Sequence, residues 1–221
     1  MIFTDWNTIE YQQAWQQQTT LFEHLIAAKI AGQSTHELET IVLCEHPHVY
    51  TLGKSGKANN MLVSEAFLKR VNASFVKVDR GGDITYHGPG QIVGYPILDL
   101  ENHGYGIKEY VSRLEEVMIH LLNSYHIHAK RLQGATGVWL DADSPKARKI
   151  CAIGIKASRY VTMHGFALNV NTNLDCFTYI NPCGFVNKGV TSMAKELGHP
   201  IDIEEVKRQL KDSLSLFLNK K

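Results

Sequence analysis

Short runs typical of β-strands recur between residues 40 and 170, and this feature constrains the fold of the chain most strongly. Apolar or alternating runs predict strands at 40–44, 74–79, 92–100, 136–140, 150–157 and 160–170. Longer amphipathic runs predict helices near the start of the chain, at 107–125 and from about residue 202 onward. Such elements bury their apolar sides only against one another. We therefore expect an α+β fold with a mixed, largely antiparallel twisted sheet flanked by helices.

Local signals place the ends of several helices. Asn7 and Glu10 predict a capping box before the first helix, and Gly32 predicts its end. A shorter helix is expected at 64–70. The inward faces of the second and last long helices are predicted to carry Val111, Leu114, Val117, Met118, Leu121 and Leu122, and Ile203, Val206, Leu210, Leu214 and Phe217.

Composition narrows the class of protein. The chain has 221 residues, of which 44% are hydrophobic, and neither a repeat nor a linker is evident, so we expect one domain spanning residues 1–221. The net charge of +1 gives no support for a nucleic-acid partner. No apolar run approaches the roughly 20 residues of a membrane helix. The N-terminal segment also lacks the pattern of a signal peptide, so a cytoplasmic location is expected.

The chain gives no pattern typical of a metal site or of disulfides. Its four cysteines are expected to be unpaired in a reducing compartment, and none has zinc-ligand spacing. His46 and His48 flank Pro47, and we interpret them as part of a polar loop at a strand end rather than as metal ligands. We expect neither a metal nor a cofactor.

The segment from Arg80 to Gln91, RGGDITYHGPGQ, is rich in turn-forming residues. Its four glycines and one proline exceed what a single turn requires. Glycine allows a backbone to approach a ligand closely, so the segment is either a ligand-binding loop or a glycine-rich hairpin with an incidental arginine. It does not match the phosphate-binding pattern of nucleotide hydrolases.

Two further positions are suited to nucleophilic catalysis. Cys183 lies between a proline and a glycine, which predicts an exposed turn where a thiol can react, and Gly184 offers a backbone N–H to an oxyanion. Lys149 stands where a polar loop enters an apolar strand. Partial desolvation there would make its amine a usable base, although a solvated lysine is the simpler interpretation. Among the histidines, His87, His120 and His164 are alternative bases for the thiol.

Several motifs together resemble the octanoyltransferases known as lipoate-protein ligase B. The family pattern RGG-x-x-T-[FY]-HGPGQ corresponds to residues 80–91. The patterns K-I-x-x-[IL]-G, HG-[FL]-ALN, I-x-PCG and V-T-S correspond to residues 149–154, 164–169, 180–184 and 190–192. Upstream, residues 45–53 also fit, except that His48 stands where the family has proline.

This resemblance implies a fold shared with biotin and lipoate protein ligases, and a catalytic dyad formed by Cys183 and Lys149. It also implies an acyl pocket from three stretches. Its expected substrate-binding residues are Arg80, Gly81, Gly82, Asp83, Ile84, Thr85, Tyr86 and His87, then Ala152, Ile153 and Gly154, and finally Gly165, Phe166 and Ala167.

The reaction that the resemblance implies is transfer of an octanoyl group from octanoyl-acyl carrier protein to a lysine of a lipoyl domain. The acceptors would be the lipoyl domains of 2-oxoacid dehydrogenase complexes and the glycine cleavage H protein. A thioester on Cys183 would carry the acyl group, without ATP. The alternatives are an ATP-dependent lipoate or biotin ligase on the same fold, and an inactive carrier-binding module.

Positive charge is concentrated in the sequence around Lys149. Residues 130–159 contain seven lysines and arginines against two aspartates, a net charge of +5. Because acyl carrier proteins are acidic, this segment predicts a salt-sensitive docking surface.

Overall fold

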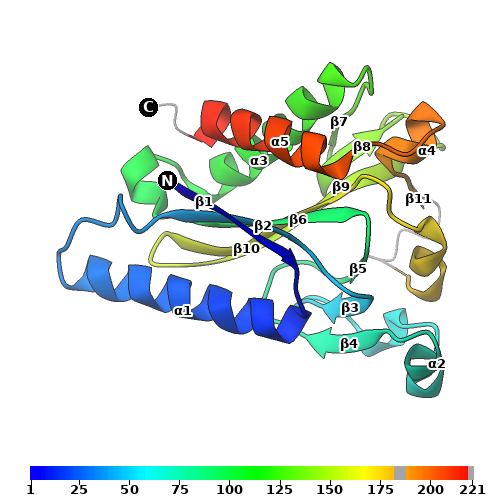
Figure 1. Cartoon of the computed structure of the whole chain (residues 1–221), viewed down its shortest axis with the longest axis horizontal. Helices are drawn as coiled ribbons and strands as arrows, with labels where there is room; N and C mark the ends of the chain where they lie inside the picture. The colour runs from blue at the N-terminus through cyan, green and yellow to red at the C-terminus, as the bar shows by residue number, and fades with distance from the viewer. Residues whose placement is uncertain (182–187, 219–221) are drawn as a thin grey trace.

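The computed structural model describes residues 1–181 and 188–218, and a twisted mixed sheet lies at its centre (Figure 1). Within those residues eight strands form this sheet, in the order β1-β2-β6-β10-β9-β8-β7, with β11 paired to β9. Their bounds are β1 Ile2–Thr8, β2 Thr40–Glu45, β6 Gln91–Ile97, β7 Lys130–Leu132, β8 Ala135–Leu140, β9 Arg148–Ser158, β10 Val161–Asn169 and β11 Gly189–Val190. The path from β2 to β7 is antiparallel throughout, whereas β1 and β11 add in parallel. The predicted α+β architecture is confirmed.

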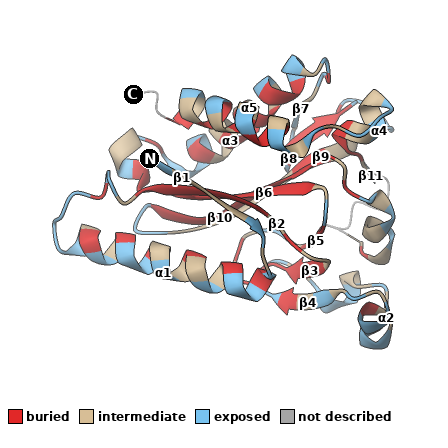
Figure 2. Ribbon diagram, in the orientation of Figure 1, coloured by how far each residue is buried: buried red, intermediate tan, exposed pale blue. Residues whose placement is uncertain are grey.

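Alternating side chains divide this sheet into two buried faces. In β2, Ile41 and Leu43 join the larger core cluster, while Val42 and Cys44 face the opposite side. Helices α3 (Ile107–Ser124) and α5 (Ile203–Leu218) cover the first face, and α1 (Tyr11–Ile30) covers the second (Figures 1 and 2). Helices therefore shield both faces of the sheet from solvent, which explains why β2, β6 and β10 are buried almost throughout.

A second, smaller sheet lies beside the N-terminal end of α1. It has the order β4-β3-β5, with β3 at Val49–Leu52, β4 at Ser74–Lys77 and β5 at Ile84–His87. Tyr11 of α1 packs with Val49, Val76 and Val78 at this junction. Helix α2 (Glu65–Arg70) precedes β4, and its first turn is capped by Ser64, whose hydroxyl accepts from Phe67 N at 3.2 Å. This arrangement places residues 80–82, which lead into β5, against β9 of the main sheet.

Some sequence-based boundaries are confirmed and one is wrong. Gly32, with φ of 69°, follows α1 as predicted, because glycine tolerates the left-handed conformation that ends a helix. The capping box is wrong, because Asn7 belongs to β1 and Glu10 caps α1 without a side-chain hydrogen bond. On the helix faces, Val111, Ile203 and Phe217 are only partly buried, while the other predicted inward residues are buried.

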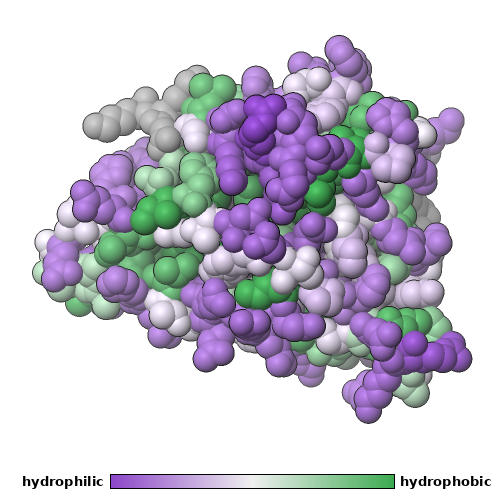
Figure 3. All heavy atoms as spheres, viewed as in Figure 1, coloured by the Kyte–Doolittle hydropathy of each residue, from purple (hydrophilic) through white to green (hydrophobic). Residues whose placement is uncertain are grey.

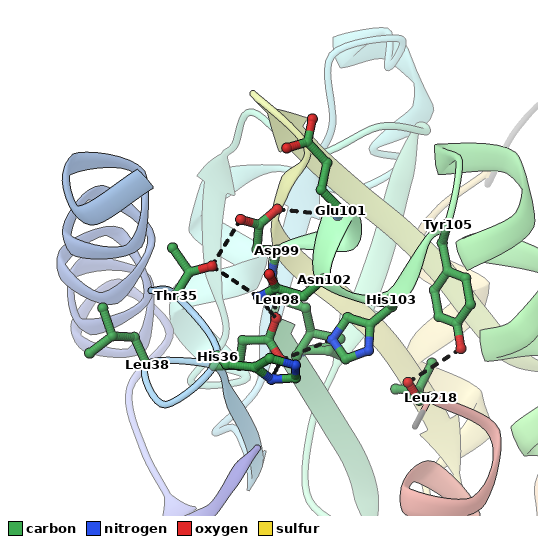
Figure 4. Close-up of polar contacts among 12 residues, drawn as sticks. Thr35, His36, Leu38, Leu98, Asp99, Glu101, Asn102, His103, Tyr105 and Leu218 are labelled. Carbon is green, nitrogen blue, oxygen red and sulfur yellow. Dashed lines mark hydrogen bonds and ion pairs between the residues drawn. The ribbon is translucent and has the colours of Figure 1, made fainter. Parts of the chain in front are cut away.

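A buried polar network holds the loop after α1 against the turn that follows β6 (Figure 4). The carboxylate of Glu39 accepts hydrogen bonds from Asn102 Nδ2 and His103 Nε2, both at 2.9 Å. Asp99 accepts from Lys29 Nζ at 2.5 Å and from Thr35 at 3.0 Å. Because each buried carboxylate has several donors, the network stabilises this end of the sheet without leaving an unpaired charge.

The surface shown in Figure 3 is dominated by hydrophilic residues with apolar ones interspersed. Among the described residues, no helix combines the length and apolar character needed to cross a bilayer.

Candidate active site

A cavity of about 410 Å³ lies between the main sheet and the segment that carries β5. Its lining comes from β6, β9 and β10 of the main sheet, from residues 80–87, and from Tyr11 of α1. Lys149, Trp139 and Lys188 also line it, together with the turn before β8. The fold thus brings together segments separated by more than 100 residues in sequence.

Four small residues form part of the cavity floor. Ala152 of β9 pairs with Ala167 of β10, and Gly154 pairs with Gly165 two positions further along the same strands. Because alternate residues of a strand share a face, both pairs lie on the same side of the sheet. The two alanines leave space that larger side chains would fill, whereas at the two glycines the missing side chain lets neighbouring backbone approach the strands.

The glycine at position 154 also lets the small sheet approach β9. A Cβ atom on Gly154 would lie 2.9 Å from the carbonyl oxygen of Gly81 and 3.4 Å from Cδ of Arg80. Gly81 in turn donates its N–H to Ile155 O at 2.8 Å. Residues 80–82 are therefore held against the strand by backbone contact.

All the predicted substrate-binding residues except Gly81 and Tyr86 line this cavity. Gly81 is used in the contact with β9, and Tyr86 points into the core of the small sheet, where its hydroxyl is 2.7 Å from His48 Nδ1. The structure thus brings the three predicted stretches together. That they bind an acyl group stays a prediction.

Arg80 is a buried cation at one end of the cavity. Its guanidinium donates to the carbonyl and hydroxyl oxygens of Thr51, at 2.7 and 2.9 Å, and to Gly81 O at 3.0 Å. These bonds fix the side chain to β3, so Arg80 both supports the small sheet and places a positive charge beside the cavity.

His87 and His164 are neutral near pH 7. Burial lowers the pKa of His87 to about 3 and that of His164 to about 4, and the nearby charge of Arg80 acts in the same direction. His164 Nε2 donates to Asp79 Oδ1 at 2.9 Å. Burial would raise the pKa of Asp79, but hydrogen bonds from His164 and Lys156 outweigh it and keep that pKa below its usual range.

A chain of buried hydrogen bonds links four of the sequence motifs. His87 Nδ1 donates to Gln91 Oε1 at 2.8 Å, and Gln91 Nε2 donates to Asn169 Oδ1 at 2.8 Å. Asn169 Nδ2 then donates to Thr191 O at 3.0 Å, and Thr191 N donates to Lys149 O at 2.9 Å. The motifs therefore share one network that ends at the backbone of Lys149.

The side chain of Lys149 is placed by its neighbours in β8. Trp139 is its cross-strand partner, and Nζ of Lys149 lies 4.6 Å from the centre of the Trp139 ring. Gly137, with φ of 115°, packs closely against β9, since a Cβ atom there would lie 2.6 Å from Cys151 O and in ordinary contact with Cε of Lys149 at 3.4 Å. Nζ of Lys188 lies 6.0 Å from the centre of the same ring.

Cys183 and Gly184 lie outside the described residues, so the predicted Cys183–Lys149 contact stays a prediction. The described segments on either side of them are anchored: Asn181 N donates to Asn60 O at 2.8 Å, and Lys188 lines the cavity. The other three cysteines pack among apolar residues, and Cys176 is only partly buried. Cys44 and Cys151 are buried, and burial raises the pKa of both thiols, that of Cys151 to about 12.

His46 and His48 make ordinary polar contacts. His46 is buried and lies 2.7 Å from Ile9 O through Nδ1 and 2.6 Å from the Tyr95 hydroxyl through Nε2. In residues 1–181 and 188–218, no group of three or more His, Cys, Asp or Glu side chains has an arrangement suited to a metal ion.

The positive segment around Lys149 is largely neutralised in the folded chain. Arg131 pairs with Glu115 and Glu116, Arg148 with Asp141 and Glu196, Lys130 with Asp143, and Lys156 with Asp79. Three of these acidic partners come from α3 and α4 (Met193–Leu197), far away in the sequence. The net charge of +5 counted along the sequence therefore overstates the charge that this surface presents.

Sequence reasoning missed several residues of the site. Tyr11, Trp139 and Lys188 line the cavity, yet none of them was singled out. The sequence pattern predicts Tyr11 only as an ordinary core residue of an amphipathic helix. The sequence pattern predicts Trp139 only as part of an apolar strand. Its place beside Lys149 follows from the pairing of β8 with β9.

Comparison with known proteins agrees with this geometry. Residues 10–215 match the family described as lipoyl protein ligase A/B catalytic domain. An octanoyltransferase from Bacteroides thetaiotaomicron is 56% identical over 220 residues, covering 100% of this chain and 96% of that protein.

Solved structures share the fold. A bi-partite lipoate protein ligase from Thermoplasma acidophilum superposes with a TM-score of 0.73 at 14% identity, covering 100% of this chain and 84% of that one. A biotin protein ligase from Aquifex aeolicus, solved with biotin and ATP, gives a TM-score of 0.53 at 12% identity, covering 98% and 69%. The biotin and lipoate ligase-like fold is confirmed, and the chain belongs to the lipoate-protein ligase B family of octanoyltransferases and is an acyltransferase.

Proposed function

We propose that this enzyme transfers an octanoyl group from octanoyl-acyl carrier protein to a lysine of apo lipoyl domains, through a thioester on Cys183 and without ATP. The observation that carries the proposal is the cavity itself, whose floor is small and apolar and whose lining includes Lys149. The relatives named octanoyltransferase support the acyl chain length, and the lipoate protein ligases support lipoyl domains as acceptors.

The dimensions of the floor suit an acyl chain of this size. Lys149 and Gly154 are five residues apart on β9, so they are separated by about 16 Å along the strand. An extended eight-carbon chain that starts beside Lys149 is shorter than this distance. It would lie over Ala152 and Ala167 and end before Arg80 and His164, which lie beside Gly154 and opposite Ile155.

The proposed chemistry has two steps. In the first, Lys149 takes the proton of the Cys183 thiol, and the thiolate attacks the carbonyl carbon of the octanoyl thioester. The resulting oxyanion collapses and expels the carrier thiolate, which takes up the proton. In the second, the neutral amine of the acceptor lysine attacks the acyl-enzyme. Cys183 then leaves as a thiolate, and Lys149 accepts the proton that the new amide loses.

Lys149 suits the role of base better than the cavity histidines do. His87 already donates through Nδ1 and lies 3.4 Å from Thr51 Oγ1 through Nε2. His164 pairs with Ile155 in the β9–β10 register, six positions beyond Lys149 along β9. His164 therefore lies at the other end of the proposed acyl chain from Lys149, and both ring nitrogens of His87 are directed at other partners.

The acyl-enzyme provides the direct test. Incubation with octanoyl-acyl carrier protein alone should add one octanoyl mass to the Cys183 peptide, and hydroxylamine should remove it. Cys183→Ser should fold and fail to form the acyl-enzyme, whereas Cys176→Ser should form it normally. An adduct on Cys151 or Cys176, or an active enzyme that forms none, would refute the thioester on Cys183.

The requirement for ATP separates this function from that of a ligase. We expect octanoyl carrier and apo lipoyl domain to give octanoylated lipoyl domain without ATP. Product formation from free octanoate and ATP would instead indicate a ligase, and absence of product under both conditions would indicate a binding module.

A further inference from the structure

Two lysine ammonium groups lie beside one buried aromatic ring in the cavity wall. Nζ of Lys149 is 4.6 Å from the ring centre of Trp139, and Nζ of Lys188 is 6.0 Å from it. Trp139 is 2% exposed, and its indole N–H donates to Ala135 O at 3.0 Å, so the ring cannot rotate freely. Both ammonium groups therefore lie within 6.0 Å of the centre of the same fixed ring.

The backbone on both sides of Lys149 keeps this arrangement in place. Lys149 pairs with Trp139 on β8 and with Val190 on β11, and Gly189 N donates to Ala147 O at 3.0 Å. Because β11 begins directly after Lys188, the pairing of β11 also fixes where Lys188 enters the site.

We propose that Lys188 acts on the reaction through Lys149: the two share the ring of Trp139, and the charge of Lys188 makes Lys149 easier to deprotonate. A neighbouring positive charge disfavours the charged form of a lysine. An aromatic ring attracts either ammonium, so it keeps the two together despite their repulsion. Lys188 is thus a positioning residue for the proposed base. The expected effect of Lys188 on the reaction rate rests on the proposed role of Lys149.

The other charged groups around Lys149 do not duplicate the effect of Lys188. Arg148, the neighbour of Lys149 on β9, is held by Glu196 of α4 at 2.6 Å and also by Asp141. Glu115 of α3 accepts from Gly137 N at 3.0 Å and from Arg131 at 3.0 Å. Among the residues that the structure describes, the other ionisable groups in the cavity lining are Tyr11, Arg80, Asp83, His87, Tyr95 and His164. On neighbouring elements are Lys130 with its partner Asp143, Glu116 paired with Arg131, Lys195 on α4 and the buried Cys151.

The proton affinity of Lys149 can be measured without substrate. Reductive methylation of the whole protein with ¹³C-formaldehyde gives a signal for each lysine, and Lys149→Arg identifies that of Lys149. In Lys188→Met the pKa of Lys149 should rise by about half a unit or more, as expected for a neighbouring unit charge in a partly buried site. Lys188→Arg should restore the value of the unsubstituted enzyme. Lys108→Met, which removes an exposed charge at the start of α3, should leave it unchanged.

The pH profile of the reaction tests the catalytic consequence. Below the pKa of Lys149, kcat/KM should fall about three-fold in Lys188→Met, and the fall should disappear at higher pH. An unchanged pKa of Lys149 in Lys188→Met would overturn the proposal. A raised pKa with an unshifted pH profile would overturn the link to the reaction. The thioester on Cys183 is tested separately, because its mass adduct does not depend on either result.

Discussion

Gln91 and Asn169 face each other across β6 and β10, and Gln91 Nε2 donates to Asn169 Oδ1 at 2.8 Å. Both side chains are buried, and Gln91 also bonds His87 of its own motif, while Asn169 also bonds Thr191 of another motif. The pair thus connects the glycine-rich segment to the strand that pairs with Lys149.

Replacement of Asn169 by leucine should therefore affect both stability and activity. The change removes the buried hydrogen bonds that Asn169 makes with Gln91 Nε2 and Thr191 O, although Gln91 Nε2 keeps its bond to Tyr86 O, and the loss costs about 1–3 kcal/mol in the free energy of unfolding. It also loosens β11, so kcat should fall more than KM rises. Urea unfolding and steady-state kinetics measure the two effects. Asn123→Leu, at an exposed position of α3, is the control and should change neither. Full activity in Asn169→Leu would show that the network does not position Lys149.

The small floor residues lead to a prediction about chain length. Ala152→Val and Ala167→Val each add two methyl groups above the floor, where the middle of the proposed octanoyl chain lies. Preference should shift from octanoyl toward shorter acyl groups such as butanoyl, by about ten-fold or more in the ratio of kcat/KM values.

Ala157→Val provides the matched control for this experiment. Ala157 lies on β9 but does not line the cavity, so the same substitution there should leave the chain-length preference unchanged. An unaltered preference in both Ala152→Val and Ala167→Val would mean that the acyl chain lies elsewhere.

The helices and strands that were predicted correctly have a strong and regular apolar pattern. Strands β2, β6 and β10 are buried on both faces and have continuous apolar runs, and α3 and α5 have clear helical spacing. Strand β1 was missed because Asp5 and Asn7 interrupt its apolar residues, and β5 because it lies within a glycine-rich segment. In these cases pairing with a neighbouring strand outweighs the local pattern.

The site was predictable to the extent that it is encoded in contiguous motifs. Residues 80–87, 152–154 and 165–167 were identified from their motifs, and all but Gly81 and Tyr86 line one cavity. The relation of Lys149 to Trp139 and Lys188 was not predictable, since it depends on strand register and on the bulge between Val138 and Trp139. The ion pairs that neutralise the basic segment were also not predictable from the sequence, because Glu115 and Glu196 lie outside residues 130–159.

Buried histidines predict how stability responds to acid. Burial lowers the pKa of His46 to about 4, of His164 to about 4 and of His87 to about 3, whereas an unfolded histidine titrates near ~6.5. The unfolded chain therefore binds more protons than the folded chain below about pH 6.5. Stability should be fully present above that pH and fall as the pH drops toward 4, by at most about 1.4 kcal/mol per pH unit for each histidine.

Unfolding experiments between pH 7 and pH 4 test this dependence. His87→Gln should reduce the slope of the unfolding free energy against pH by about one third, because it removes one of the three buried imidazoles. His24→Gln, at an exposed position of α1, should leave the slope unchanged. A slope that is identical in His87→Gln and the unsubstituted enzyme would show that other groups control acid unfolding.

The geometry of β9 separates the basic residues that can contact an acidic carrier from those that cannot. Lys146 is exposed in the loop that leads into β9, three residues before Lys149. Arg159 is also exposed, but it follows the far end of the same strand, about 30 Å from Lys149 along it. A carrier whose thioester reaches Lys149 would therefore dock near Lys146 and away from Arg159.

Charge reversal at these two positions should give different results. Lys146→Glu should raise KM for octanoyl-acyl carrier protein several-fold at low salt, and added salt should reduce the difference, because the Debye length shortens to about 8 Å at physiological ionic strength. Arg159→Glu changes the net charge of the protein equally and should leave KM close to that of the unsubstituted enzyme. An equal rise of KM in both variants would indicate that overall charge, rather than a docking surface near Lys149, attracts the carrier.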